Sequence, residues 1–215
     1  MHLCCRFLIP PLFLLGATAV LAQETTPIVQ PGAPGQPGKL LTEATVHVAP
    51  PAPFSADVEF MQGMIMHHQQ AVDMVALLRT HGKSPTLRSF GDKISISQTD
   101  EIRFMKQWLE MRGKATTMEM DHSHMSAADM KNMIMPGMLT PEQMAALTKA
   151  RGAQFDHLFL TGMIQHHGGA LTMVDDLFKT PGAGQDPVLF DFATDIDSTQ
   201  SAEIKIMREM LKEKP

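Results

Sequence analysis

The sequence is poor in cysteine and in aromatic residues other than phenylalanine. Its 215 residues include two cysteines, one tryptophan and no tyrosine. Both cysteines, Cys4 and Cys5, lie at the extreme N-terminus, within a segment that we expect to be removed. The mature chain would then contain no thiol, which excludes disulfides and thiolate metal sites. Any metal must be held by histidine, methionine or carboxylate side chains.

Basic charge and long apolar runs are also scarce. With 18 basic and 23 acidic residues the net charge is -5, so nucleic acid is not an expected partner. The apolar run over residues 7–20 is interrupted by Pro10 and Pro11, and it is shorter than the roughly 20 residues of a spanning helix. Residues 1–22 instead resemble a secretory signal peptide cleaved after Ala22. We therefore expect a periplasmic or secreted protein without a membrane span.

The remaining chain divides into a linker and one helical domain. Residues 23–53 are rich in proline and glycine, which predicts a disordered linker. The domain, residues 54–213, should begin with a helix capped by the hydroxyl of Ser55 and ending near Thr80. A second helix is expected over about residues 85–111. A short helix should begin at a Thr140 capping box, followed by helices over 152–179 and from 187 toward 212. No hairpin dipeptide separates alternating apolar runs, so the predicted class is all-α.

A duplication organises this domain. The segment FMQGMIMHHQQAVDMV at 60–75 returns as FLTGMIQHHGGALTMV at 159–174, an offset of 99 residues. The helix after each copy repeats too, with an offset of 102. Two related helical hairpins, each with one apolar face, most simply close into a four-helix bundle. Residues 114–138 form an irregular insert between them.

The repeated motif G-M-I-x-H-H-x-x-A-x-x-M contains the candidate metal ligands. At helical spacing both histidines of each copy flank the buried stripe, and the last methionine lies on the side of the first histidine. A single buried histidine is more often a core residue, and methionine usually packs. Two adjacent pairs at one helical phase favour ligation, because burying four imidazoles without partners would cost roughly 1–3 kcal/mol each. The candidates are Met64, His67, His68, Met74, Met163, His166, His167 and Met173.

The partner helices contribute repeat-related polar residues. Glu101 and Glu203 each follow a glutamine, Gln98 or Gln200, by about one helical turn. They either orient the imidazoles from behind or lie on an exposed helix face, and the pattern does not decide between these alternatives. We do not count them as ligands.

The insert contains a second group of candidate ligands. Its 25 residues include seven methionines and two histidines without amphipathic periodicity. Thioethers and imidazoles at short spacing suit soft monovalent ions such as Cu(I) or Ag(I). The alternative is that the methionines fold back on the bundle, which we expect for Met130, Met133, Met135 and Met138. The insert ligands that we favour are Met118, Met120, His122, His124 and Met125.

These patterns together resemble the domain of unknown function 305 family of bacterial exported proteins. The resemblance rests on the doubled M-I-x-H-H-x-x-A motif, Q-x-x-E-I-x-x-M-x-x-W/M-L on the partner helices and the lead-in GMLTPEQM, over about residues 54–211. It implies a ferritin-like four-helix bundle and, for copper-binding members, copper tolerance outside the cytoplasm. The family motif falls on His67, His68, Met74, His166, His167 and Met173. Gly168 and Gly169 replace Gln69 and Gln70, which we expect to loosen the second motif helix.

Three functions follow as hypotheses. The first is an exported copper-binding protein that buffers or carries Cu(I), with Ag(I) or Cu(II) as further candidates and another copper-handling protein as a candidate partner. The second is a ferritin-like metal-dependent oxidoreductase. Such sites usually use Glu-x-x-His motifs, and the only one here, Glu119 to His122, lies in the insert. We therefore expect no enzyme. The third is a structural or partner-binding bundle with a methionine-rich surface.

Overall fold

The computed structural model describes residues 28–30, 37–41, 52–118 and 135–212, which belong to two separate compact units. In the first unit, β1 (Ile28–Gln30) pairs antiparallel with β2 (Lys39–Leu41), and Val29 lies opposite Leu40. This short hairpin was not expected within the predicted linker. It is compatible with the β-branched Ile28 and Val29, and the two strand side chains whose exposure is described, Val29 and Leu40, are exposed.

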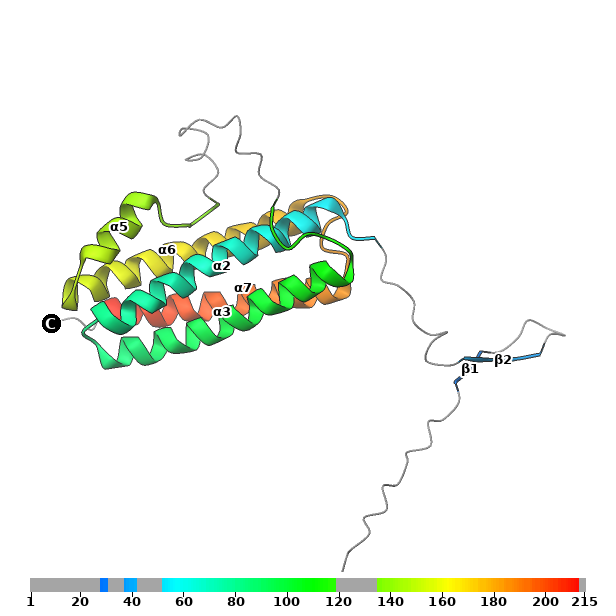
Figure 1. Cartoon of the computed structure of the whole chain (residues 1–215), viewed down its shortest axis with the longest axis horizontal. Helices are drawn as coiled ribbons and strands as arrows, with labels where there is room; N and C mark the ends of the chain where they lie inside the picture. Colours follow the sequence, from blue (N-terminus) through cyan, green and yellow to red (C-terminus); the bar gives the residue numbers. More distant parts are fainter. Residues whose placement is uncertain (1–27, 31–36, 42–51, 119–134, 213–215) are drawn as a thin grey trace, which may run out of the picture. The chain divides into compact units, whose positions relative to one another are not determined.

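The second unit is a helical bundle. Its helices are α2 (Ser55–His81), α3 (Pro85–Met111), α5 (Pro141–Lys149), α6 (Gly152–Lys179) and α7 (Pro187–Lys212). The α2–α3 and α6–α7 hairpins are the two sequence repeats; α2 packs on α6, and the short α5 lies against α6 (Figure 1). The all-helical bundle of duplicated hairpins expected from the sequence is confirmed. Most of the insert, residues 119–134, lies outside the described residues.

Two helix starts have side-chain caps, one of them the capping box predicted at Thr140. The hydroxyl of Ser84 accepts from the Leu87 amide, and Thr140 forms a capping box with Gln143. The prediction that Ser55 caps α2 is wrong, because the N-cap residue is Phe54 and it makes no side-chain cap. Phe54 instead packs over Gly182 in the α6–α7 connection, where an added Cβ would lie 3.4 Å from its ring. An aromatic contact, rather than a hydroxyl cap, lies at this entry to α2.

Two buried aspartates hold each repeat to the loop of the other. Asp57 on α2 accepts from the Gly184 amide in the α6–α7 connection at 2.7 Å. Its repeat equivalent on α6, Asp156, accepts from the amides of Lys83 and Ser84 in the α2–α3 connection, both at 3.0 Å. These charge-assisted bonds are quasi-symmetric, and they fix the two hairpins to each other at both ends of the bundle.

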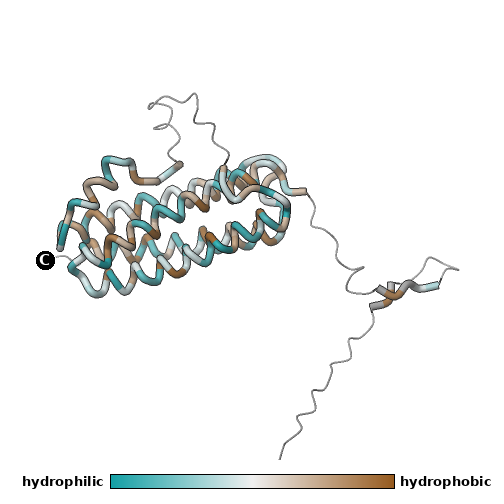
Figure 2. The backbone as a smooth tube through the Cα atoms, in the orientation of Figure 1, coloured by the Kyte–Doolittle hydropathy of each residue, from teal (hydrophilic) through white to brown (hydrophobic). Residues whose placement is uncertain are grey.

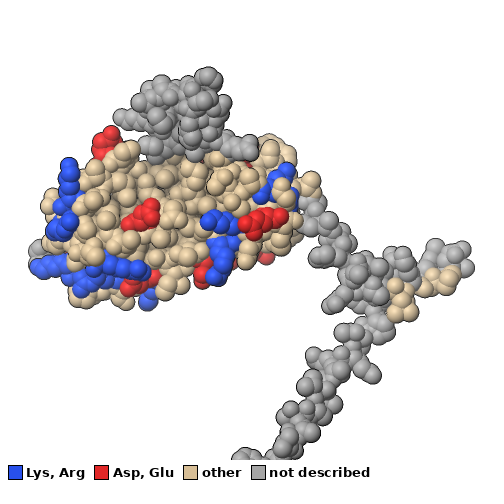
Figure 3. Space-filling model, viewed as in Figure 1, with Lys and Arg blue, Asp and Glu red and all other residues tan. Residues whose placement is uncertain are grey.

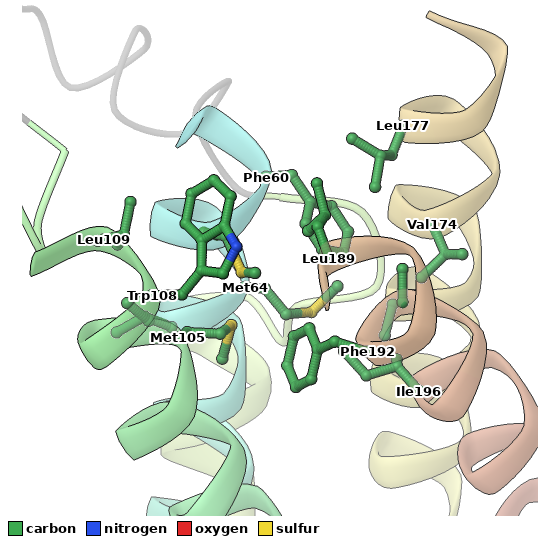
Figure 4. Packing of buried hydrophobic residues seen from close by; sticks show 14 of the residues in the cluster. Phe60, Met64, Met105, Trp108, Leu109, Val174, Leu177, Leu189, Phe192 and Ile196 are labelled. Carbon is green, nitrogen blue, oxygen red and sulfur yellow. The ribbon is translucent and has the colours of Figure 1, made fainter. Parts of the chain in front are cut away.

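The apolar core consists of two clusters. One is built around Phe60, Trp108 and Leu189 and is shown in Figure 4. The other surrounds Phe155 and Phe159, close to α5. The hydropathy colouring in Figure 2 alternates along each helix, as expected for helices with one buried side. Along each of the four long helices, the residues of one cluster are separated from those of the other by a short stretch with buried polar side chains.

Candidate metal site

The interval between the two clusters is a buried polar layer. On α2 it contains His67 and His68, and on α6 their equivalents His166 and His167; all four have 0% exposed area. The facing helices add Gln98 on α3 and Gln200 on α7, each 2% exposed. The bundle thus brings all four predicted histidine ligands into its interior.

The inner histidines, His67 of the first repeat and His166 of the second, contact each other. The ring centroids of His67 and His166 lie 3.8 Å apart, with an interplanar angle of 38°. His166 Nε2 lies 2.8 Å from the backbone carbonyl of His67, and His67 Nε2 lies 3.0 Å from that of Pro136. Since a carbonyl oxygen only accepts, Nε2 of both rings must be the donor. Their Nδ1 atoms are then the positions available to a metal.

The outer histidines each have a carboxylate behind them. His68 Nε2 donates to Glu101 Oε2, and His167 Nε2 donates to Glu203 Oε2, both at 2.6 Å. Ser97 also donates to the other oxygen of Glu101. Of the two alternatives left open by the sequence, the structure shows the orienting one. Carboxylates bound to the distal imidazole nitrogen are typical partners of metal-ligating histidines.

The polar layer lacks hydrogen-bond partners at the atoms that a metal would use. Nδ1 of all four histidines is buried, and none has a hydrogen-bond partner among the described residues. The same is true of the side-chain amide atoms of Gln98 and Gln200. Such atoms cost roughly 1–3 kcal/mol each when they are left unpaired. These unpaired donors and acceptors are better explained by the binding of a ligand than by a contribution to folding stability.

Burial keeps the inner imidazoles neutral. It lowers the pKa of His67 from 6.5 to about 3, with further lowering by His68. Burial likewise lowers the pKa of His166 well below its usual value, and His67 adds to this effect. Burial of Glu101 acts to raise its pKa, but the hydrogen bond and charge of His68, together with the Ser97 hydrogen bond and the charge of His167, outweigh it, so that the net pKa is lowered. Neutral inner imidazoles are in the protonation state that metal binding needs.

The predicted methionine ligands separate into three groups. Met64, Met74 and Met163 are fully buried within the two hydrophobic clusters. Met118 and Met173 are half-buried beside α2 at Gly63. The remaining insert candidates, Met120, His122, His124 and Met125, lie outside the described residues, as do Met130 and Met133. Within the described ranges, no three His, Cys, Asp or Glu side chains form a ready-made metal cage.

The end of the insert, together with Leu139, contacts residues of the histidine layer and its neighbours, which the sequence did not reveal. Besides the Pro136 carbonyl at His67, the Gln70 side chain accepts from the Leu139 amide at 2.7 Å and donates to its carbonyl at 3.0 Å. On α6, a Cβ at Gly169 would lie 1.9 Å from the Pro136 oxygen. We call residues 135–139 the strap.

The strap gives the second glycine of the pair a structural role. Helix α6 runs without interruption through Gly168 and Gly169. Gly169 is the repeat equivalent of Gln70, and its missing side chain makes room for the strap that Gln70 binds. The departure from repeat symmetry at this position was the sequence signal for this contact.

A groove opens between α3 and α7, whose mutual packing is weaker than that within either hairpin. It has a volume of about 490 Å³ and is lined by Phe104 and Phe192 together with carboxylates. Glu101 belongs to its wall and also accepts from His68. The groove therefore extends from the surface to a carboxylate that contacts the buried layer. The acidic residues in its wall are Asp100, Glu101, Asp191 and Asp195. On the face of the bundle drawn in Figure 3, acidic and basic side chains are interspersed.

These features define a duplicated helical-hairpin bundle with a buried histidine layer. The chain belongs to the family described as domain of unknown function (DUF305), which matches residues 57–211. The resemblance noted in the sequence is thereby confirmed. No curated protein matches the chain.

Solved structures, two of them of this family, have the same fold. A DUF305 fragment from Deinococcus radiodurans is 28% identical, with a TM-score of 0.64, covering 75% of this chain and 99% of that one. A DUF305 protein from Streptomyces coelicolor is also 28% identical, with a TM-score of 0.63, covering 74% and 93%. CopM in its Cu(I)-bound form is 27% identical, with a TM-score of 0.55, covering 73% and 95%. CopM structures with Cu(II) and with silver are similar as well.

Proposed function

We propose that this protein is an exported copper-binding protein that buffers or carries Cu(I) and thereby contributes to metal tolerance. Ag(I) and Cu(II) are further ions that it would accept. The observation that carries the proposal is the set of four buried imidazole Nδ1 atoms without partners among the described residues, placed between two apolar clusters. The metal is cargo in this proposal, and the protein catalyses no reaction.

The donor chemistry supports copper over harder metals. Imidazole and thioether ligands suit Cu(I), whereas carboxylate cages suit magnesium, calcium or manganese. In the described layer the carboxylates of Glu101 and Glu203 each accept from a histidine, so they support ligands rather than form a cage. The copper- and silver-bound forms of CopM, a neighbour with the same fold, point to the same ions.

The inner pair brings together one histidine from each repeat. His67 and His166 lie in ring contact and are neutral, and they belong to different repeats. An ion held by their Nδ1 atoms would link the two halves of the bundle. The acidic groove between α3 and α7 gives a cation a negatively charged approach to the layer.

Export is part of the proposal because of the leader-like segment at residues 1–22. No helix in the described part of the chain has the length and apolar character of a membrane span. Cell fractionation of the full chain tests this point: we expect the N-terminus to be processed after Ala22 and the product to be found outside the cytoplasm. An unprocessed cytoplasmic product would contradict export.

The central experiment is an anaerobic Cu(I) titration of the mature protein against a competing chelator, repeated with Zn(II) and Fe(II). The variant His67→Ala with His166→Ala should lose most of the tight Cu(I) binding. His157→Ala is the matched control, because His157 is exposed on α6. Unchanged Cu(I) affinity in the double variant would rule out the bundle site.

The oxidoreductase hypothesis is separated by a second measurement. Steady oxygen consumption by protein loaded with copper or iron would indicate turnover and contradict a pure carrier. Absence of competitive Cu(I) binding by the wild-type protein would contradict the proposal as a whole, and it would favour a structural bundle.

A further inference from the structure

Three methionine side chains end at one point on the surface of α2. A Cβ atom built on Gly63 would lie 3.2 Å from Met135 Sδ, 3.4 Å from Met173 Cε and 3.6 Å from Met118 Cε. These residues come from the strap, from α6 and from the segment after α3, so the sequence separates them widely. The glycine leaves a depression in which three thioether ends meet.

Both irregular segments that supply these methionines are tied to α2 near Gly63. Gln62 donates to the Ala115 carbonyl at 2.8 Å, three residues before Met118. His67 donates to the Pro136 carbonyl, directly after Met135. Met173 is held by α6 itself. The backbone therefore positions all three side chains without using their sulfur atoms.

The other repeat shows that packing alone does not require methionine here. At Gly162, the equivalent of Gly63, a built Cβ would meet two carbons of Leu139 and the terminal methyl of Met74. Met74 and Met173 are thus equivalent, but leucine completes the depression on the second side. Of these two equivalent positions, the one next to the insert gathers three thioethers.

We infer that Met118, Met135 and Met173 form a trithioether site for a soft monovalent cation, Cu(I) or Ag(I), distinct from the imidazole layer. This inference rests on the proposed function and adds a ligand, Met135, and a defined place to it. Thioethers are neutral and polarisable, and three rotatable bonds let each sulfur turn toward an ion at the centre. Binding at this site releases no proton.

The site adjoins the imidazole layer through a single peptide link. Met135 would be a ligand, while the carbonyl of Pro136 accepts from His67. An ion on the thioethers therefore lies beside the strap segment that contacts the buried histidine. All three methionines are half-buried, so that solvent reaches the site more readily than it reaches the imidazoles.

The test uses Ag(I), which does not change oxidation state, with mature protein labelled with ¹³C at the methionine methyl groups. Single methionine-to-leucine variants assign the three signals. We expect the methyl signals of Met118, Met135 and Met173 to shift together along one binding curve. In any of the three leucine variants the other two signals should lose that common shift, and one equivalent of tightly bound silver should disappear.

Two further variants separate ligation from packing. Met105→Leu replaces a fully buried core methionine and should leave the silver stoichiometry unchanged. Gly63→Ala retains every methionine but adds a methyl group within 3.4 Å of two thioether ends, so it should weaken silver binding while the helix keeps its stability. Independent shifts of the three methyl signals, or none, would overturn the inference.

The imidazole variant distinguishes this inference from the proposed function. If His67→Ala with His166→Ala abolishes tight Cu(I) binding while the leucine variants change nothing, the trithioether site is wrong and the carrier function stands. If the common methyl shift survives in the imidazole double variant, the thioether site is independent of the layer. If the wild-type protein binds neither Cu(I) nor Ag(I), both proposals fail.

Discussion

The Nε2 atom of His166 donates to the backbone carbonyl of His67, and the two rings are in contact, with centroids 3.8 Å apart. A side chain of one repeat thus binds the backbone of the other at the centre of the bundle. Because this bond occupies Nε2, the geometry leaves Nδ1 as the atom for a ligand.

Removing the charge of a carboxylate behind an outer histidine should weaken metal binding. Glu101→Gln and Glu203→Gln preserve an oxygen that accepts from Nε2, but they lose the negative charge that increases imidazole basicity. We expect Cu(I) affinity to fall by about tenfold or more in each variant, as is typical for such partners. The competition titration measures it. Glu110→Gln, at an exposed position on α3, is the matched control and should not change the affinity.

The metal-free protein should lose stability as the pH falls from 6.5 toward 5. The folded-state pKa of His67 is lowered to about 3 and that of His166 is also lowered, so the unfolded state binds more protons in this window. Their stabilising contribution is full above the unfolded pKa of 6.5. Each residue contributes a slope of up to about 1.4 kcal/mol per pH unit. Urea unfolding in the presence of a chelator measures the slope.

A variant isolates the histidine contribution to this pH dependence. His67→Gln should show a smaller slope between pH 6.5 and 5 than the wild type, whatever its stability at pH 7. The lowered pKa of Glu101 adds a loss of stability only at more acidic pH, through its ordinary carboxyl range. A flat stability profile in the wild type over this window would contradict neutral, buried inner histidines.

The two adjacent glycines of α6 should respond oppositely to alanine. Gly168→Ala adds a methyl group with no neighbour within 4 Å among the described residues, so it should stabilise the helix by up to about 1 kcal/mol. Gly169→Ala places a Cβ 1.9 Å from the Pro136 oxygen and should displace the strap, with a destabilisation of about 1–3 kcal/mol. Chemical unfolding of the pair measures both. Equal effects would show that the strap does not pack on Gly169.

The buried aspartates should differ in their tolerance of asparagine. Asp156 uses both carboxylate oxygens, one for the Lys83 backbone N–H and one for the Ser84 backbone N–H. In Asp156→Asn one of these N–H groups would face the side-chain NH₂ group, which is itself a donor. Asp57 accepts from Gly184 through one oxygen, and asparagine can preserve that bond with its own oxygen. We expect Asp156→Asn to cost about 1–3 kcal/mol and Asp57→Asn less. Thermal unfolding compares them, and a larger loss for Asp57→Asn would contradict this assignment.

The helices and their duplication could be predicted from the sequence because they depend on local and periodic features. Proline at the start of α3, α5 and α7, with glycine beyond the ends of α2 and α3, set boundaries that the structure reproduces closely. The hairpin at β1 and β2 was missed, since three-residue strands carry almost no periodicity. Capping of α2 was also predicted wrongly, because the Phe54 contact with Gly182 joins residues far apart in the chain.

The sequence by itself determined that two histidine pairs share one helical phase and that no thiol remains beyond Cys5, so the candidate ligand types follow from residue identity and spacing alone. Only the tertiary structure decided how these ligands are used. Burial between two apolar clusters makes the inner imidazoles neutral, and carbonyls from distant residues occupy Nε2 and leave Nδ1. Likewise, Met118, Met135 and Met173 meet only because helix packing and the strap bring them to Gly63. Helical periodicity specifies the direction in which a side chain points from one helix, whereas a binding site depends on distances between side chains of several helices.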